Sequence, residues 1–252
     1  MRRETQNILL VLLGGALLKL ALTGTYLRYV KESLQPWLVV TGGVMVVLAV
    51  VSIVRDVRAG QAQTAPDGHE GHDGAEHAPV DHSGHDHGTS RSPWMLLLPV
   101  FAVFLISPPA LGADTVNRSD RNAAQEAKAS SGFAPLPSDD VIPLTITEFV
   151  TRTAWDDSGS LDDRTVKLTG FVVRKDADVY VARLTISCCA ADASPVKAKM
   201  VGQDFGALPT DQWIEATGRV VPGSATKETA FVPTFTVSEV VPIPAPEDTY
   251  EG

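Results

Sequence analysis

Two long apolar segments open the chain. Ile8–Val30 carries a single charge, Lys19, over most of its length, and Leu34–Val54 carries none. A helix that spans the hydrocarbon core of a membrane needs about 20 predominantly apolar residues. The pattern therefore predicts two transmembrane helices within residues 1–55. The first is too long for the apolar region of a signal peptide and is followed at once by another span, so we expect it to be retained as an anchor.

A third uncharged apolar segment, Trp94–Ala113, lies within residues 93–113. Pro108 and Pro109 close it, because proline cannot continue a helix. We therefore expect two to three transmembrane helices. A small excess of Arg and Lys on one side favours a cytoplasmic N-terminus and a C-terminal domain outside. The expected location is the bacterial cell membrane, with several crossings.

Lys19 is the unusual residue of the first segment, because it lies near the middle of the predicted span. A charge in the membrane interior is costly and usually faces a partner or a cavity. None of the three apolar segments contains an acidic residue. Two interpretations stay open: Lys19 contacts a carboxylate of another membrane subunit, or the helix tilts and the side chain reaches the interface.

Residues 56–92 are polar and hold every histidine of the chain, alternating with Asp and Glu. Nothing in this stretch could form an apolar core, so we expect a disordered loop. Neutral imidazole binds zinc and related divalent transition metals. The irregular spacing predicts a flexible chelator, and the alternative is a solvated spacer. The candidate ligands are His69, His72, His77, His82, His85 and His87.

The C-terminal half predicts a linker over residues 114–140, with a helical patch at Ala123–Ala129, and a soluble β domain over residues 141–252. A short helix is expected within 144–155. Short β-branched runs separated by turn residues predict five strands. We expect a membrane α region plus an all-β domain, an OB-like five-stranded Greek-key barrel, with a small β-sandwich as the alternative. The predicted strands are Thr165–Val173, Val179–Ser187, Val196–Val201, Trp213–Val221 and Phe231–Val241.

The two cysteines of the chain, Cys188 and Cys189, are adjacent, so a disulfide-rich scaffold is excluded. Neighbouring side chains of an extended strand point to opposite faces, but a strand end or bulge could bring both sulfurs to one side. Asp192 can fold back as a third ligand or as a hydrogen-bond acceptor. Three interpretations stay open: the thiols are structural and partly buried, they bind a metal with Asp192, or they form a redox disulfide.

Several classes of function are disfavoured. The net charge of −9 argues against a nucleic-acid-binding protein, which needs a basic face. The β domain has no histidine, so Cys–His and Ser–His nucleophiles are absent from it. No triad, paired-carboxylate motif or phosphate loop is present. We therefore expect a protein that is not an enzyme.

Three motifs carry a resemblance to a known family: SCCAADASPV at Ser187–Val196, the W-I-x-x-x-G pattern that begins at Trp213, and PPALGA at Pro108–Ala113. With the paired N-terminal spans and the histidine-bearing loop, they make the chain similar to the YcgQ-like permease-subunit family of bacteria. The resemblance implies a multi-spanning membrane permease as partner. We thus expect a non-enzymatic accessory subunit of a permease complex that handles a divalent metal, zinc or a related ion. The alternative is a membrane-anchored thiol redox module.

Overall fold

The computed structural model divides the chain into two compact units, and each is described by itself. The first unit contains residues 1–23 and 36–108, and the second contains residues 24–35 and 109–252. The residues that the structure describes are 3–62, 105, 109–119, 122 and 133–251.

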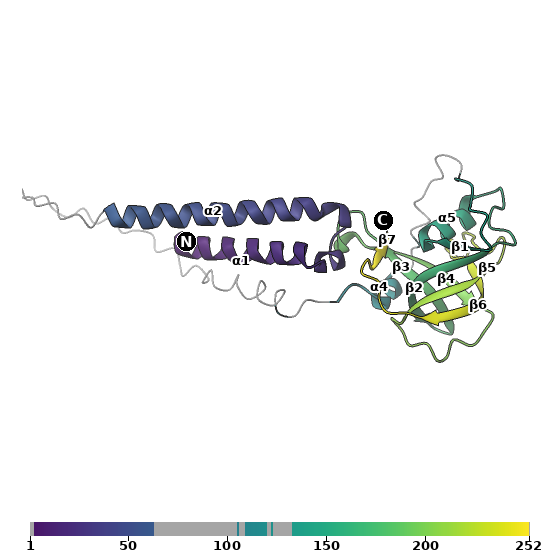
Figure 1. The fold of residues 1–252 in the computed structure, drawn as a ribbon. Helices are drawn as coiled ribbons and strands as arrows, with labels where there is room; N and C mark the ends of the chain where they lie inside the picture. The colour runs from purple at the N-terminus through teal and green to yellow at the C-terminus, as the bar shows by residue number, and fades with distance from the viewer. Residues whose placement is uncertain (1–2, 63–104, 106–108, 120–121, 123–132, 252) are drawn as a thin grey trace, which may run out of the picture. The chain divides into compact units, whose positions relative to one another are not determined.

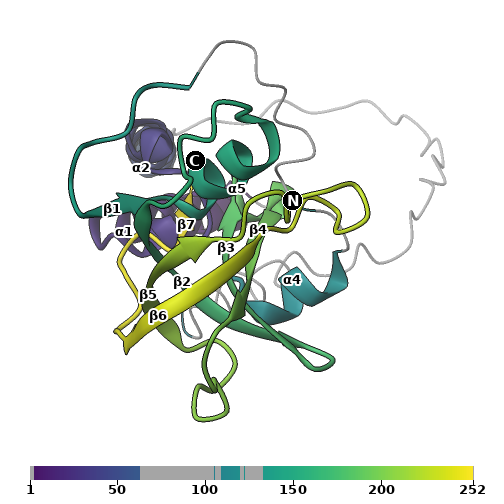
Figure 2. The same ribbon diagram turned by 90° about the vertical axis from the view of Figure 1, so that its right-hand side faces the viewer.

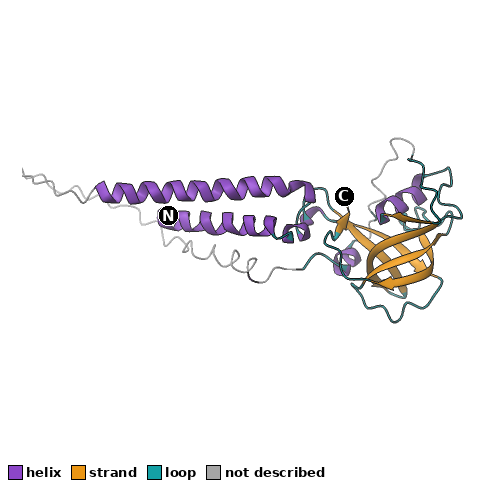
Figure 3. Cartoon of the chain, in the orientation of Figure 1, coloured by secondary structure: helices purple, strands orange, loops and turns teal. Residues whose placement is uncertain are grey.

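The first unit contains two long helices, α1 (Arg3–Leu22) and α2 (Gln35–Ala62), which run side by side (Figures 1 and 3). Glycines bring their backbones together. A β-carbon on Gly14 would lie 2.9 Å from the carbonyl oxygen of Gly42, whereas one on Gly15 would meet nothing within 4 Å. Small residues at such a contact are typical of helix pairs in membranes.

The first helix is shorter than the sequence predicted. It ends at Leu22, not at Val30, because Gly24 takes a left-handed conformation with φ of 75° and the Thr23 hydroxyl donates to the Lys19 carbonyl. The chain then turns through two 3₁₀ segments, η1 (Thr25–Arg28) and η2 (Glu32–Leu34). Lys19 therefore lies in the last turn of α1, not in the middle of a span.

The second helix is longer than predicted and includes residues 56–62, which we had assigned to the disordered loop. Those residues contain no proline, so nothing in the backbone stops the helix there. Among the described residues, one helical stretch, Glu32–Arg58, is long and apolar enough to cross a membrane by length and composition, and Gln6–Leu22 is a shorter apolar helix.

Most of the predicted third span lies outside the described residues. Its end, Pro109–Gly112, is not helical, and α4 (Ala113–Arg118) follows. Ala113 and Val116 of α4 are buried in the second unit. The start of the predicted linker is therefore part of the folded domain. The predicted helical patch at 123–129 lies outside the described residues.

The second unit is built on one mixed sheet of seven strands in the order β1-β2-β5-β6-β4-β3-β7, with a further pairing of β2 with β3. Three pairs are parallel: β1–β2, β4–β6 and β3–β7. The other four, β2–β3, β2–β5, β3–β4 and β5–β6, are antiparallel. The strands are β1 (Val141–Leu144), β2 (Thr165–Lys175), β3 (Asp178–Thr185), β4 (Ser194–Val201), β5 (Trp213–Val220), β6 (Thr234–Pro242) and β7 (Tyr250–Glu251).

All five predicted strands are present with shifted ends, and the short strands β1 and β7 were missed. The largest shift is at the start of β6, where Phe231 has φ of 58° and so cannot belong to a strand. The domain is not all-β, because α4 and α5 (Ile146–Trp155) lie against different parts of the sheet (Figure 2).

Two apolar clusters stabilise this unit. The larger is centred on Phe149 of α5, which meets Phe235 of β6 edge to face with ring centres 5.3 Å apart. The smaller contains Val116 of α4, Phe171 of β2 and Tyr250 of β7. The helix α5 begins where a capping pattern predicts it, since the Thr145 hydroxyl accepts from the amide of Glu148.

Candidate metal site

The two cysteines lie in the connection between β3 and β4. The strand β3 ends at Thr185, and a 3₁₀ turn, η5 (Ala190–Asp192), leads into β4. Because Cys188 is past the strand end, the two thiols need not point to opposite faces. Their sulfur atoms lie 3.7 Å apart. The strand-end arrangement that the sequence allowed is therefore the one observed.

Asp192 folds back over this turn, as its position in the sequence predicted. One carboxylate oxygen accepts from the amide of Ser187 at 2.9 Å, and the other accepts from the amides of Cys188 at 2.9 Å and Cys189 at 3.5 Å. The carboxylate thus fixes the backbone that carries both thiols. One ligand atom from each of Cys188, Cys189 and Asp192 lies within 4.8 Å of the others.

The two thiols differ in exposure. Cys188 is exposed and Cys189 is half-buried, and both are free thiols. A cysteine with a purely structural role is usually shielded from solvent. The exposure of Cys188 therefore favours the metal and redox interpretations, and the structural interpretation stays a prediction.

The electrostatics of the site keep the proton on sulfur. The pKa of Cys188 is raised to about 11, first by its hydrogen bond to Asp192, then by its hydrogen bond to Cys189 and by burial. The pKa of Asp192 is lowered to about 2, first by the Cys188 thiol and then by the amides of Ser187 and Cys188. At neutral pH the site therefore holds an ionised carboxylate beside a protonated Cys188 thiol.

The loop between α1 and α2 (residues 24–35, the interhelical loop) belongs to the same compact unit as residues 187–192, which carry the two cysteines and Asp192 (the thiol turn). Val30 and Cys189 pair as an isolated antiparallel bridge. The amide of Lys31 donates to the Cys188 carbonyl at 3.1 Å, and the amide of Ala190 donates to the Tyr29 carbonyl at 2.7 Å. We had placed most of this loop in the first membrane span, so the sequence analysis missed these contacts.

The side chain of Tyr250 also holds the interhelical loop in place. Its hydroxyl donates to the Arg28 carbonyl at 2.9 Å and accepts from the amide of Leu111 at 3.2 Å. Burial is the main reason why the pKa of Tyr250 is raised. One buried side chain of the C-terminal strand thus joins the interhelical loop to the segment that precedes α4.

Two family models match the chain: the DUF1980 N-terminal domain over residues 5–121 and the DUF1980 C-terminal domain over residues 124–251. The chain belongs to the DUF1980 family. No curated protein and no solved structure matches it. In this DUF1980 chain the two family regions meet between residues 121 and 124, so the interhelical loop belongs to the N-terminal region and the thiol turn to the C-terminal one.

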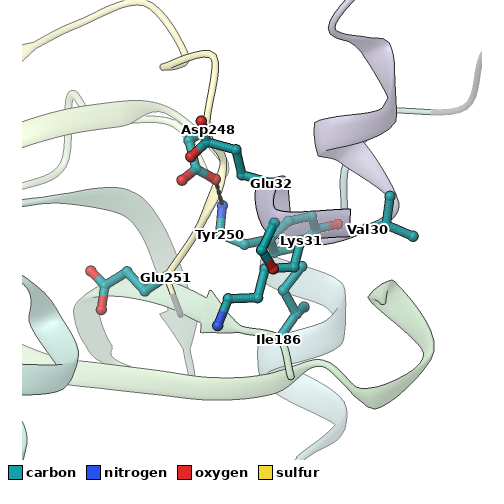
Figure 4. A pocket seen from close by; sticks show the side chains of 8 residues that line it. Val30, Lys31, Glu32, Ile186, Asp248, Tyr250 and Glu251 are labelled. Carbon is teal, nitrogen blue, oxygen red and sulfur yellow. Dashed lines mark hydrogen bonds between the residues drawn. The ribbon is translucent and has the colours of Figure 1, made fainter. Parts of the chain in front are cut away.

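A cavity of about 150 Å³ lies beside the docked loop (Figure 4). Glu251 is part of its wall, but the carboxylate is already engaged, since it accepts from the amides of Ile146 and Thr147 at the start of α5. Glu251 therefore has a structural role in this wall, because it links β7 to the start of α5. The lining residues are Val30, Lys31, Glu32, Ser33, Ile186, Asp248, Tyr250 and Glu251.

The other sequence-predicted site residues do not join the thiol turn in the described structure. The six candidate histidines lie outside the described residues. Lys19 is exposed in the last turn of α1, where a long side chain can reach a membrane interface. The other interpretation, that Lys19 contacts a carboxylate of another membrane subunit, stays a prediction.

The donor set at the thiol turn fits a thiophilic divalent ion. For metal–sulfur bonds of about 2.3 Å, a tetrahedral angle places two sulfurs about 3.8 Å apart, close to the 3.7 Å observed. Thiolates prefer zinc and related soft or borderline ions, and the carboxylate offsets the positive charge. Cys188, Cys189 and Asp192 of the DUF1980 chain would hold such an ion, with one coordination position left for water or another ligand.

Proposed function

We propose that this protein is a non-enzymatic, membrane-anchored accessory subunit of a permease complex, and that it binds a divalent transition metal of the zinc class through Cys188, Cys189 and Asp192. The observation that carries the proposal is the convergence of three ligand atoms within 4.8 Å on an exposed turn. The multi-spanning permease as partner comes from the resemblance of the SCCAADASPV segment to the YcgQ-like family.

Metal binding is favoured over the redox alternative by the third donor. Ligand atoms of Cys188, Cys189 and Asp192 all lie within 4.8 Å of one another, and a redox disulfide needs no such carboxylate. The raised pKa of Cys188 weighs against both alternatives alike, because the thiolate both attacks disulfides and binds metals.

We also propose three membrane crossings with the thiol domain outside. The loop 24–35 belongs to the same compact unit as residues 109–252, which supports placing both on one side of the membrane. If α2 crosses the membrane, the chain must cross again between its end at Ala62 and residue 109. Residues 93–108 of the predicted third span are the apolar stretch left for this crossing. The histidine tract would then face the cytoplasm.

The five strands of the ring β2-β3-β4-β6-β5 support an OB-like barrel. The pairings run from β2 to β3, β4, β6 and β5 and return to β2, and the β4–β6 pair is parallel. We propose that these strands close into a five-stranded Greek-key barrel. Such a barrel would present the β3–β4 connection, and with it the two cysteines, at one of its ends.

The decisive experiment is a cadmium titration of the purified full-length chain in detergent, followed by the near-ultraviolet charge-transfer band of cadmium–thiolate bonds. This band reports thiolates alone, so the histidine tract does not contribute to it. We expect a saturable band in the natural sequence and its loss in Cys188→Ser and Cys189→Ser. Asp157→Asn, an exposed acid elsewhere in the domain, is the control that should keep it.

Two results would refute the proposed metal site. One is the absence of a cadmium–thiolate band in the fully reduced natural sequence. The other is a protein isolated with an internal disulfide, detected as a mass lower by two hydrogens, that binds no metal after reduction. The second result would favour the thiol redox module.

A further inference from the structure

The thiol turn is held from two directions. On one side the Asp192 carboxylate accepts from the amides of Ser187 and Cys188. On the other side the interhelical loop contributes the amide of Lys31, which donates to the Cys188 carbonyl at 3.1 Å, and the Tyr29 carbonyl, which accepts from Ala190 at 2.7 Å. The peptide groups on both sides of Cys189 are thus bonded to the loop that joins α1 and α2.

The interhelical loop is also held by contacts other than those with the thiol turn. Tyr26 is 5% exposed, and the Tyr250 hydroxyl donates to the Arg28 carbonyl. The loop is also covalently continuous with α1 at Thr23 and with α2 at Gln35. If the loop moves, the backbone that sets the distance between the two sulfurs must change. The link between α1 and α2 must change as well.

We propose that the Gly24–Gln35 loop positions the thiol pair, so that docking of this loop and metal binding at Cys188, Cys189 and Asp192 are coupled. The proposal rests on the proposed metal site. When the ion binds, each coordinating thiol gives its proton to solvent and forms one metal–sulfur bond, and no electron is transferred. Coupling between two events is reciprocal, so the ion must stabilise the docked loop by the same factor by which the docked loop raises metal affinity.

Lys31 offers a matched pair of variants. Its backbone has φ of −62° and ψ of 143°, which proline adopts without strain, and Val30 before it is paired as extended chain, as a residue before proline should be. Lys31→Pro removes the amide that donates to Cys188. Lys31→Ala keeps that amide, and both variants lose the lysine side chain. The difference between them therefore isolates one hydrogen bond.

Cadmium titration of the two full-length variants tests the coupling. We expect Lys31→Pro to bind cadmium roughly five- to tenfold more weakly than Lys31→Ala, as the loss of one hydrogen bond implies. Equal affinities in two variants with the same circular dichroism spectrum would overturn the coupling and leave the metal site intact. No cadmium–thiolate band even in the natural sequence would overturn both proposals.

A second measurement needs no substitution. Hydrogen exchange of the natural full-length chain, read by mass spectrometry, should slow in peptides covering residues 26–35 when cadmium is added. The Cys188→Ser/Cys189→Ser double variant is the control and should show no such change. Protection confined to the thiol turn, with exchange of the loop unchanged, would overturn the coupling.

Discussion

Replacement of Asp192 by asparagine should make Cys188 more reactive and the site weaker as a metal ligand. The Asp192 carboxylate is the first cause of the raised pKa of Cys188, about 11 against an ordinary 9.0. At pH 8 a thiol with a pKa of about 11 is roughly one part in a thousand thiolate, and one with a pKa of 9.0 is roughly one part in ten. The thiolate fraction could therefore rise by at most about a hundredfold.

The rate of disulfide exchange should rise by less than the fraction of Cys188 that is thiolate. Nucleophilicity falls with pKa, with a Brønsted coefficient of about 0.4–0.5, which removes roughly six- to tenfold over this range. The ceiling on the increase in the rate of disulfide exchange is therefore about ten- to sixteenfold. Asparagine keeps one side-chain oxygen that can still accept from the amides of Ser187 or Cys188, so we expect the turn to survive.

The assay measures the reaction of an aromatic disulfide with the full-length chain, in a Cys189→Ser background that leaves Cys188 as the single thiol. The rate as a function of pH gives the pKa directly. Asp192→Asn should move the midpoint toward lower pH, Asp157→Asn should not move it, and thermal unfolding should verify that both variants fold. An unchanged midpoint in a folded Asp192→Asn variant would refute the electrostatic reasoning.

Three further predictions concern other parts of the chain. Gly14→Ala should lower the melting temperature of the full-length protein in detergent, because the new β-carbon would lie 2.9 Å from the Gly42 carbonyl oxygen. Gly15→Ala, whose β-carbon would meet nothing within 4 Å, should not lower it. Equal melting temperatures of the two variants would contradict the close helix contact. Tyr250→Phe should lower the free energy of unfolding by about 1 kcal/mol, because two part-buried hydrogen bonds lose their partner. Tyr180→Phe, which removes a hydroxyl 3.3 Å from Asp178, should lower it less in chemical unfolding. A peptide of residues 66–88 should bind zinc in calorimetry, more weakly below about pH 6, where imidazole protonates; no heat at neutral pH would leave only a spacer.

Local patterns in the sequence predicted much of the second unit. Short β-branched runs predicted β2 to β6 to within a few residues, and the apolar pattern of residues 144–155 predicted the short helix that α5 forms. Asp192 was predicted to fold back as a third ligand or hydrogen-bond acceptor, because it ends a turn-like Ala-Ala-Asp stretch directly after the two cysteines. In each case the signal lies within a few residues of the structure that it specifies.

The interhelical loop carried no comparable signal. Residues 21–27 carry no charge and Arg28 is the single charge before Val30, so hydropathy alone extends the first span. Only Thr23-Gly24 indicates a helix end. The pairing of Val30 with Cys189 joins residues that are distant in sequence. A single sequence gives no information on which distant backbone segments pair. The short strands β1 and β7 were missed for the same reason.

A site with three donor atoms on an exposed turn would suit the transfer of an ion to a partner better than its permanent binding. Structural zinc sites are closed by four protein ligands, whereas the described residues group only Cys188, Cys189 and Asp192 here. The open position admits an incoming ligand from a partner, so exchange need not break every bond at once. If Cys188 binds the ion as a thiolate, binding releases a proton, so the proposed affinity falls as the pH falls. The affinity would then depend on local proton concentration as well as on the docked loop. On the proposed function, both are conditions that a permease partner could change at the moment of transfer.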